Sequence, residues 1–314
     1  MKKNFAIHNF VYVLAGVFLL PMMKDFAQES ISAARPDDAT WPAFIRDSAS
    51  FGKPLILTAR KRIAISPGAG EFKSVEEKVS WDPKKTAVII CDMWNKHWCK
   101  GASERVAEMA PRMNEVVSDL RARGVLIIHA PSETMNFYTS ATQRLMAMAA
   151  PKAQSRTPVQ KDGYPLGLVK EGSFPIDHSD AGCDCESKCK VGNPWRRQIE
   201  TLEIMEGDAI TDNDQAYNLM RQRDIDNVII MGVHTNMCVL NRPFAIRAMV
   251  KKGQNVMLMR DMTDTMYCHT MRPQVSHFRG TDLVIEFIEK YWCPTITSAD
   301  VTGKPAFHFK ADQQ

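Results

Sequence analysis

The chain has 314 residues, of which 45% are hydrophobic and 24% are charged, as expected for one large globular domain with extensions or for two small domains. Its net charge of +4 is small for this length and gives no reason to expect nucleic acid or an anionic membrane as a partner. No internal repeat or low-complexity tract is present in the sequence.

The N-terminus has the pattern of a secretory signal peptide. Lys2 and Lys3 precede an apolar stretch over about residues 10–23, and Ala27 provides a small residue near its end. The apolar stretch is short for a transmembrane span, so we predict a signal peptide over residues 1–27, with an uncleaved membrane anchor as the alternative. The mature protein is therefore expected to be periplasmic or secreted and free of the membrane.

Residues 28–84 are predicted to form an irregular N-terminal extension. They contain several prolines and the turn Ser-Pro-Gly-Ala-Gly at 66–70. Two short apolar runs within this segment, at 54–57 and 62–65, are candidates for the two arms of a hairpin.

Beyond the extension, strand and helix patterns alternate. Apolar runs typical of central parallel strands occupy 86–92, 124–129, 227–233 and 255–259. Helical patterns occupy 103–123, 214–223, 238–252 and 282–292, and shorter strands are expected at 206–210 and 295–297. This alternation predicts an α/β fold with a three-layer, doubly wound, mostly parallel sheet.

We place this main domain at residues 85–298, followed by a C-terminal tail at 299–314. Residues 131–205 interrupt the alternation and are rich in proline, glycine and lysine, with three cysteines. Insertions of this length in α/β proteins usually cover the binding face or form an interface, and we expect the same of this Cys-rich insertion.

Side chains able to do chemistry follow three of the predicted strands. Asp92 ends the first strand, His129 ends the second, and Cys238 stands between a later strand and its helix. Ligands bind at the carboxyl ends of such strands. At a helix start, backbone N–H groups favour the thiolate, which predicts a reactive Cys238, and Asp92 could take its proton. The alternative is a buried cysteine that only packs.

Two segments resemble the isochorismatase-like cysteine hydrolases, a superfamily that includes nicotinamidases and other amidases. Gly-Val-His-Thr-Asn-Met-Cys-Val at 232–239, followed by Arg242 and Ala245, resembles the nucleophile motif. Ile-Ile-Cys-Asp-Met-Trp-Asn at 89–95 resembles the first strand, which ends in the catalytic aspartate. The resemblance covers about residues 84–298 and implies the isochorismatase-like fold with strand order 3-2-1-4-5-6.

Carried over position by position, the resemblance implies Cys238 as nucleophile and Asp92 as general base. It also implies a non-proline cis peptide bond between Val233 and His234, which turns the His234 N–H toward an oxyanion beside that of Cys238. The implied activity is hydrolysis of a C–N bond in a small amide through a thioester, with no cofactor required.

The catalytic lysine of this family is missing, since its position falls at about Asp212. Lys96, four residues after Asp92, is our candidate replacement, and a solvated loop lysine is the alternative. The missing lysine also motivates a second hypothesis, in which a degenerate family member binds a small molecule or a metal without catalysis.

The histidine set of the nicotinamidase metal site is also missing after the second strand. Neither that metal site nor nicotinamide as substrate is therefore expected. His129 is predicted to be a pocket or core residue, and Trp94 is a candidate pocket residue. Arg242 and Arg247 are candidates for binding a substrate carboxylate, with surface or interface ion pairs as the alternative.

A separate cluster contains His178, Cys183, Cys185 and Cys189. One histidine and three cysteines form a set that tetrahedral zinc accepts, although the spacing is not a standard zinc spacing. In an exported protein a disulfide, for example Cys183 or Cys185 with Cys189, is an alternative, and free thiols are another. Beyond this cluster we expect a small-molecule substrate and a homo-oligomer as partners.

Overall fold

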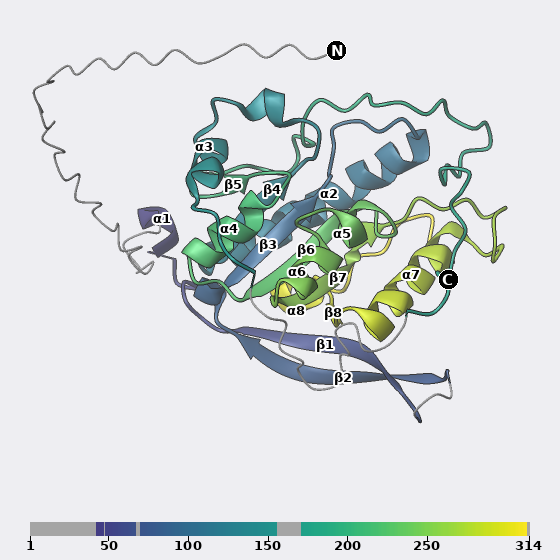
Figure 1. The fold of residues 1–314 in the computed structure, drawn as a ribbon, viewed down its shortest axis with the longest axis horizontal. Helices are drawn as coiled ribbons and strands as arrows, with labels where there is room; N and C mark the ends of the chain where they lie inside the picture. The colour runs from purple at the N-terminus through teal and green to yellow at the C-terminus, as the bar shows by residue number, and fades with distance from the viewer. Residues whose placement is uncertain (1–41, 47, 67–69, 156–170, 313–314) are drawn as a thin grey trace, which may run out of the picture. The chain divides into compact units, whose positions relative to one another are not determined.

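Figure 1 shows the computed structural model of the chain, which describes residues 42–46, 48–66, 70–155 and 171–312. The chain divides into two units, Met1–Ala34 and Arg35–Gln314, and the described residues all belong to the second. The predicted signal peptide therefore lies outside the described residues. Within those ranges, no helix is both long enough and apolar enough to cross a membrane.

A single eight-stranded sheet organises the described chain, in the order β2-β1-β8-β7-β6-β3-β4-β5. Its strands are β1 (Leu55–Ala64), β2 (Phe72–Trp81), β3 (Thr86–Cys91), β4 (Leu126–Ala130), β5 (Ala209–Ile210), β6 (Asn227–Val233), β7 (Asn255–Asp264) and β8 (Thr295–Ile296). Strands β3 to β8 are parallel, and β1 runs antiparallel to both of its neighbours. Numbered from β3, the parallel strands read 3-2-1-4-5-6, which is the order given in the prediction.

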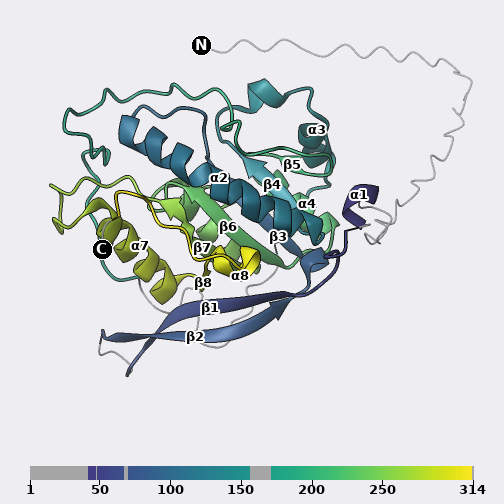
Figure 2. The same cartoon turned by 180° about the vertical axis from the view of Figure 1, so that it is seen from behind.

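Helices cover both faces of this sheet, which confirms the predicted three-layer α/β class. One face packs against α2 (Lys100–Ala122) and α8 (Ala299–Thr302), as Figure 2 shows. The other face packs against α3 (Thr142–Ala149), α4 (Gln215–Gln222), α5 (Cys238–Asn241), α6 (Ile246–Lys251) and α7 (His277–Tyr291). The remaining short helices are α1 (Ala43–Arg46), η2 (Pro83–Lys85) and η3 (Met135–Tyr138).

Strand β3 shows why the central strands are apolar throughout. All six of its residues are buried, and its side chains alternate between the two faces. Ala87 and Ile89 belong to one apolar core, whereas Val88 and Ile90 belong to the other. A strand covered by helices on both faces needs apolar residues at every position, which is the pattern that predicted it.

The segment predicted to be irregular instead contributes the antiparallel hairpin β1–β2. Most of both apolar runs, 54–57 and 62–65, lies in β1, so their prediction as two hairpin arms is wrong. The basic residues between them are compatible with a strand because Arg60 and Arg62 pair with the buried Glu289 of α7, at 2.7 and 3.2 Å.

All four predicted helices have different bounds in the structure, and two of them differ most. The helix expected over 238–252 is split into α5 and α6, because Pro243 lacks the N–H that a continuous helix needs there. The helix expected from Asp282 begins at His277 instead, where the Ser276 side chain caps it by accepting the N–H of Arg279 at 3.1 Å.

Candidate active site

The predicted nucleophile and base meet where β3 and β6 end side by side. The parallel register pairs Cys91 with Gly232, so Asp92 and the loop that leads to Cys238 leave the sheet together. Gly232 has a φ of +108°, and a Cβ there would lie 2.0 Å from the Cys91 carbonyl oxygen. Only glycine permits this approach of the two strands, which brings Asp92 to the nucleophile loop.

Asp92 is fully buried, and three groups surround its carboxylate. The Ser132 N–H donates to Oδ1 at 2.7 Å, and the Arg242 Nε lies 3.3 Å from Oδ2. The Cys238 thiol lies within hydrogen-bonding reach of the same carboxylate. Burial raises the pKa of Asp92 above its usual value, while Arg242, Cys238 and Ser132 act in the opposite direction. The result is a carboxylate that can both accept and return a proton.

The Cys238 thiol is half-buried at the start of α5. Burial and the neighbouring Asp92 carboxylate raise the pKa of Cys238 to about 12, against the effect of Arg242. The predicted lowering of this pKa by a helix start is therefore wrong, because α5 is a helix of only four residues and the thiol faces a buried carboxylate. A pKa in this range favours the neutral thiol form of Cys238.

Arg242, rather than Lys96, is the cation that the structure brings to this pair. Its guanidinium spans the Asp92 carboxylate and that of Glu133, whose Oε1 lies 3.1 Å from Nη2. Lys96 is exposed, and within the described ranges it makes no ion pair with either carboxylate. Asp212, at the expected lysine position, accepts the Glu133 N–H at 3.3 Å. The four-residue spacing between Cys238 and Arg242 was the sequence signal for this contact.

The peptide bond between Val233 and His234 is cis, as the resemblance implied. Neither the N–H of His234 nor that of Cys238 donates a hydrogen bond to any group in the described part of the chain. Burial, with a further contribution from His97, lowers the pKa of His234 to about 3, so its imidazole is neutral. Two N–H groups at the nucleophile are thus available to a substrate oxygen.

A group of aromatic rings lies next to residues that flank the pair. The candidate pocket residue Trp94 stacks on Trp195 with ring centroids 4.4 Å apart, and its Nε1–H donates to the Ser132 carbonyl oxygen at 3.0 Å. His97 lies beside both Trp195 and His234, at 5.7 and 4.9 Å between centroids. The sequence prediction missed Trp195 and His97, although Trp195 lies in the insertion that was expected to cover the binding face.

His129 belongs to the core rather than to a pocket. It is fully buried, with Nδ1 2.9 Å from the Gln198 side-chain oxygen and Nε2 3.1 Å from Asp208. Although burial opposes it, His129 and Arg121 hold the pKa of Asp208 below its usual value. This network lies beside β4 and β5, and among the described residues its hydrogen bonds join His129, Asp208, Gln198 and Arg121 rather than Cys238 or Asp92.

The cysteines of the predicted histidine–cysteine cluster gather in the structure, with one change of member. Cys183, Cys185 and Cys189 come together, but the fourth member is Cys99 and not His178. The His178 ring instead makes an edge contact with Phe174 at 5.7 Å between centroids. No disulfide joins any of the eight cysteines, all of which the structure describes. We refer to Cys99, Cys183, Cys185 and Cys189 as the four-cysteine site.

No protein-family model matches the sequence, and no curated protein matches it. Several solved structures are similar to the chain. A cysteine hydrolase from Pseudomonas syringae pv. phaseolicola 1448A is 21% identical, covers 71% of this chain and 93% of its own, and has a TM-score of 0.44. An isochorismatase family protein from Burkholderia thailandensis is 17% identical, covers 71% and 96%, and has a TM-score of 0.39. A ribonuclease from Caenorhabditis elegans is 12% identical, covers 71% and 84%, and has a TM-score of 0.40.

Proposed function

We propose that this protein is a cysteine hydrolase of the isochorismatase-like type, which cleaves a C–N bond of a small-molecule amide through a thioester. The observation that carries the proposal is the buried Asp92 carboxylate beside the Cys238 thiol, held from its other side by Arg242 at 3.3 Å. A buried carboxylate next to a thiol is the arrangement of an acid–base catalyst and its nucleophile.

In the first half-reaction the Cys238 sulfur attacks the amide carbonyl carbon while its proton passes to Asp92. The negative charge that develops on the carbonyl oxygen is held by the backbone N–H groups of His234 and Cys238. Asp92 then returns the proton to the departing nitrogen, and the C–N bond breaks. The products of this step are a free amine and a thioester on Cys238.

In the second half-reaction water attacks the thioester carbonyl carbon, and Asp92 accepts the proton from the water. The C–S bond breaks, the proton returns to the Cys238 sulfur, and a carboxylic acid leaves. The raised pKa of Asp92 suits both steps, because the group must give up the proton as readily as it takes it.

We propose that Arg242 supplies the positive charge that the family's lysine supplies elsewhere. Its guanidinium favours the thiolate form of Cys238 and the carboxylate form of Asp92. The Glu133 carboxylate fixes the opposite end of the guanidinium.

We further propose that residues 1–27 direct export, so that the enzyme acts in the periplasm or outside the cell as a homo-oligomer. The basic and apolar pattern of the N-terminus supports the export proposal.

A hydrolysis assay with a panel of small primary and secondary amides tests the proposed function. We expect release of ammonia or amine by the wild-type chain and none by Cys238→Ala. The matched control is Cys293→Ala, which removes a different buried thiol, in the core beside α7, and is expected to retain activity. Tight binding of a panel compound without hydrolysis by the wild type would contradict the proposal and favour a binding protein instead.

A further inference from the structure

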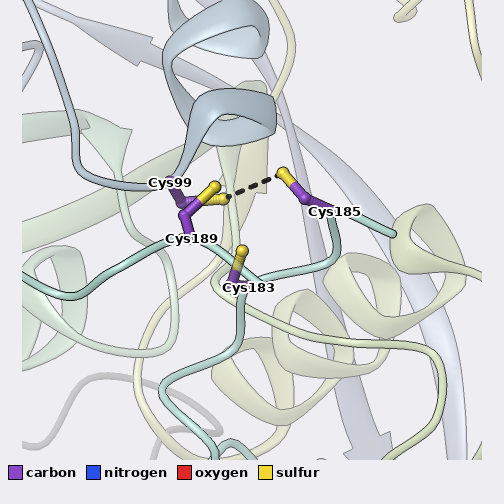
Figure 3. A group of neighbouring side chains, drawn as sticks. All are labelled: Cys99, Cys183, Cys185 and Cys189. Atoms are coloured by element: carbon purple, nitrogen blue, oxygen red, sulfur yellow. Dashed lines mark hydrogen bonds between the residues drawn. The ribbon is translucent and has the colours of Figure 1, made fainter. Parts of the chain in front are cut away.

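The four-cysteine site gathers ligands from two distant parts of the chain. Cys99 immediately precedes α2, whereas Cys183, Cys185 and Cys189 come from the loop of the insertion (Figure 3). All four Sγ atoms lie within 4.8 Å of one another, and the Cys99 and Cys185 sulfurs are 3.8 Å apart. Cys99 and Cys183 are buried, and the other two are half-buried.

These separations fit one metal ion. A zinc–sulfur bond of about 2.3 Å sets the edge of a ZnS₄ tetrahedron at about 3.8 Å. Disulfide-bonded sulfurs lie about 2.05 Å apart, and the Cys99–Cys185 separation exceeds that distance. An iron–sulfur cluster spreads its thiolates over two or more irons, which moves the sulfurs further apart than the edges of a single tetrahedron.

Backbone N–H groups contact two of the sulfurs, and the Asp184 carboxylate, which Arg105 binds, lies 3.9 Å from the Cys99 Sγ. The N–H of Gly101 donates to the Cys185 Sγ at 3.4 Å, and the N–H of Lys100 donates to the Cys189 Sγ at 3.5 Å. The Arg105 guanidinium, on the first turns of α2, donates two hydrogen bonds to the Asp184 carboxylate, of 2.7 and 3.2 Å. Backbone N–H donors of this kind orient thiolate ligands and partly offset the negative charge that four thiolates leave around a divalent ion, and Arg105 balances the Asp184 carboxylate beside them.

We propose that Cys99, Cys183, Cys185 and Cys189 bind one Zn²⁺ ion as a tetrahedral tetrathiolate. Four protein ligands fill the coordination sphere, so the ion has no open position for substrate and acts structurally. The ion links the insertion to the start of α2, since Cys99 immediately precedes that helix and the other three ligands come from the loop of the insertion.

The fastened loop supports the nucleophile. Met237, the residue before Cys238, packs against the apolar cluster that contains Cys99 and Met266. Asn236 makes two hydrogen bonds with the backbone of Met266, at 2.9 and 3.0 Å. Zinc would therefore support the cluster against which the residues just before Cys238 pack.

The charged groups of this region connect the same elements. Arg105 binds Asp264 at the end of β7 at 2.8 Å, and the Asp264 carbonyl oxygen accepts the Thr235 N–H at 2.8 Å. One arginine therefore links the loop that carries Asp184 to the residues just before the nucleophile. Loss of zinc is expected to increase the mobility of the loop that carries Asp184 and of the residues just before Cys238.

Metal analysis of the full chain, purified under reducing conditions without chelator, tests the proposal. We expect about one zinc per chain, and X-ray absorption with a single Zn–S shell near ~2.3 Å and no nitrogen or oxygen ligand. Cobalt substitution is expected to give the visible absorption of a tetrahedral thiolate site. A single bound iron, a cluster, or a metal-free protein with a disulfide among these four cysteines would overturn the proposal.

Variants separate this site from the proposed hydrolysis. Cys185→Ser and Cys189→Ser are expected to lose zinc and to unfold at a lower temperature, whereas the matched control Cys293→Ala keeps its zinc. If the serine variants fail to fold, chelator-driven zinc release from the wild type is the second measurement, and re-addition of zinc should restore the melting temperature. Zinc content does not depend on hydrolysis. The zinc proposal can therefore be supported or contradicted independently of the proposed hydrolase function.

Discussion

The nucleophile pair and the four-cysteine site lie on either side of one loop but are built differently. Cys238 and Asp92 each follow a central parallel strand, and the register of β3 and β6 brings them together. The four-cysteine site takes Cys99 from the start of α2 and its other ligands from a loop more than eighty residues later. Sheet register creates the first site, whereas packing of the loop against a helix creates the second.

Replacing Asp92 tests the nucleophile side of this comparison and should have the largest effect. We expect Asp92→Asn to lower kcat/KM for amides by about 10²–10⁴-fold, because no group then carries the proton to the leaving nitrogen. Aryl esters, whose leaving groups depart without a proton, should be affected less. Equal losses for amides and aryl esters would contradict the proposed role.

Replacing Arg105 tests the connection between the two sites. Its guanidinium is mostly buried between Asp184 and Asp264, so Arg105→Met removes one of the two basic partners that the buried Asp264 has among the described residues and leaves only His277, at 2.8 Å. Breaking a buried pair in this way costs about 3–5 kcal/mol of unfolding free energy. We expect denaturant unfolding to show this loss together with weaker zinc retention. A variant as stable as the wild type would show that the two sites are independent.

Replacing Arg242 should have a moderate effect with a characteristic pH dependence. Burial already raises the pKa of Asp92, and Arg242 opposes that rise, so Arg242→Met raises the pKa further. Because Asp92 must be ionised to accept a proton, the acidic limb of the kcat/KM profile should move to higher pH. We also expect Arg242→Met to lower the maximum of kcat/KM by about 10–100-fold.

The conservative variant Arg242→Lys should recover part of this activity, since it keeps the charge but cannot bridge two carboxylates in the same way. An acidic limb at the same pH in all three proteins would contradict the assignment of Arg242.

Replacing Lys96 should have the smallest effect. Lys96 is exposed and makes no ion pair among the described residues, so Lys96→Met is expected to change kcat/KM less than about twofold and the unfolding free energy by less than about 0.5 kcal/mol. A loss comparable to that of Arg242→Met would restore the sequence-based assignment of this lysine.

These contrasts also explain how much the sequence could predict. Strand β6 has the predicted bounds, and Asp92 and Cys238 meet as expected, because apolar runs and the chemistry at their ends are local patterns. The arms of the edge hairpin were misplaced because the basic residues of β1 are neutralised by Glu289, more than two hundred residues away. Cys99 was missed for the same physical reason, since its partners are contributed by a distant loop.

The pKa of Cys238 could not be predicted from its position at a helix start. A helix as short as α5 contributes little to the pKa of this thiol. Burial and the Asp92 carboxylate, which follows another strand, raise that pKa instead. Arg242 was identified in the sequence, but its role depends on Asp92 and Glu133, which only the folded chain places around it.

Trapping of an acyl group on Cys238 tests the central claim most directly. An activated aryl acetate needs no proton on its leaving group, and loss of the Asp92 charge eases ionisation of the Cys238 thiol, so Asp92→Asn should still be acylated, whereas its deacylation is slow without a base for water. After acid quenching, intact-mass analysis and peptide mapping should show one acetyl group on Cys238. The double variant that also carries Cys238→Ala should show none. Acylation absent from Cys238, or spread equally over other cysteines, would contradict its assignment as the nucleophile.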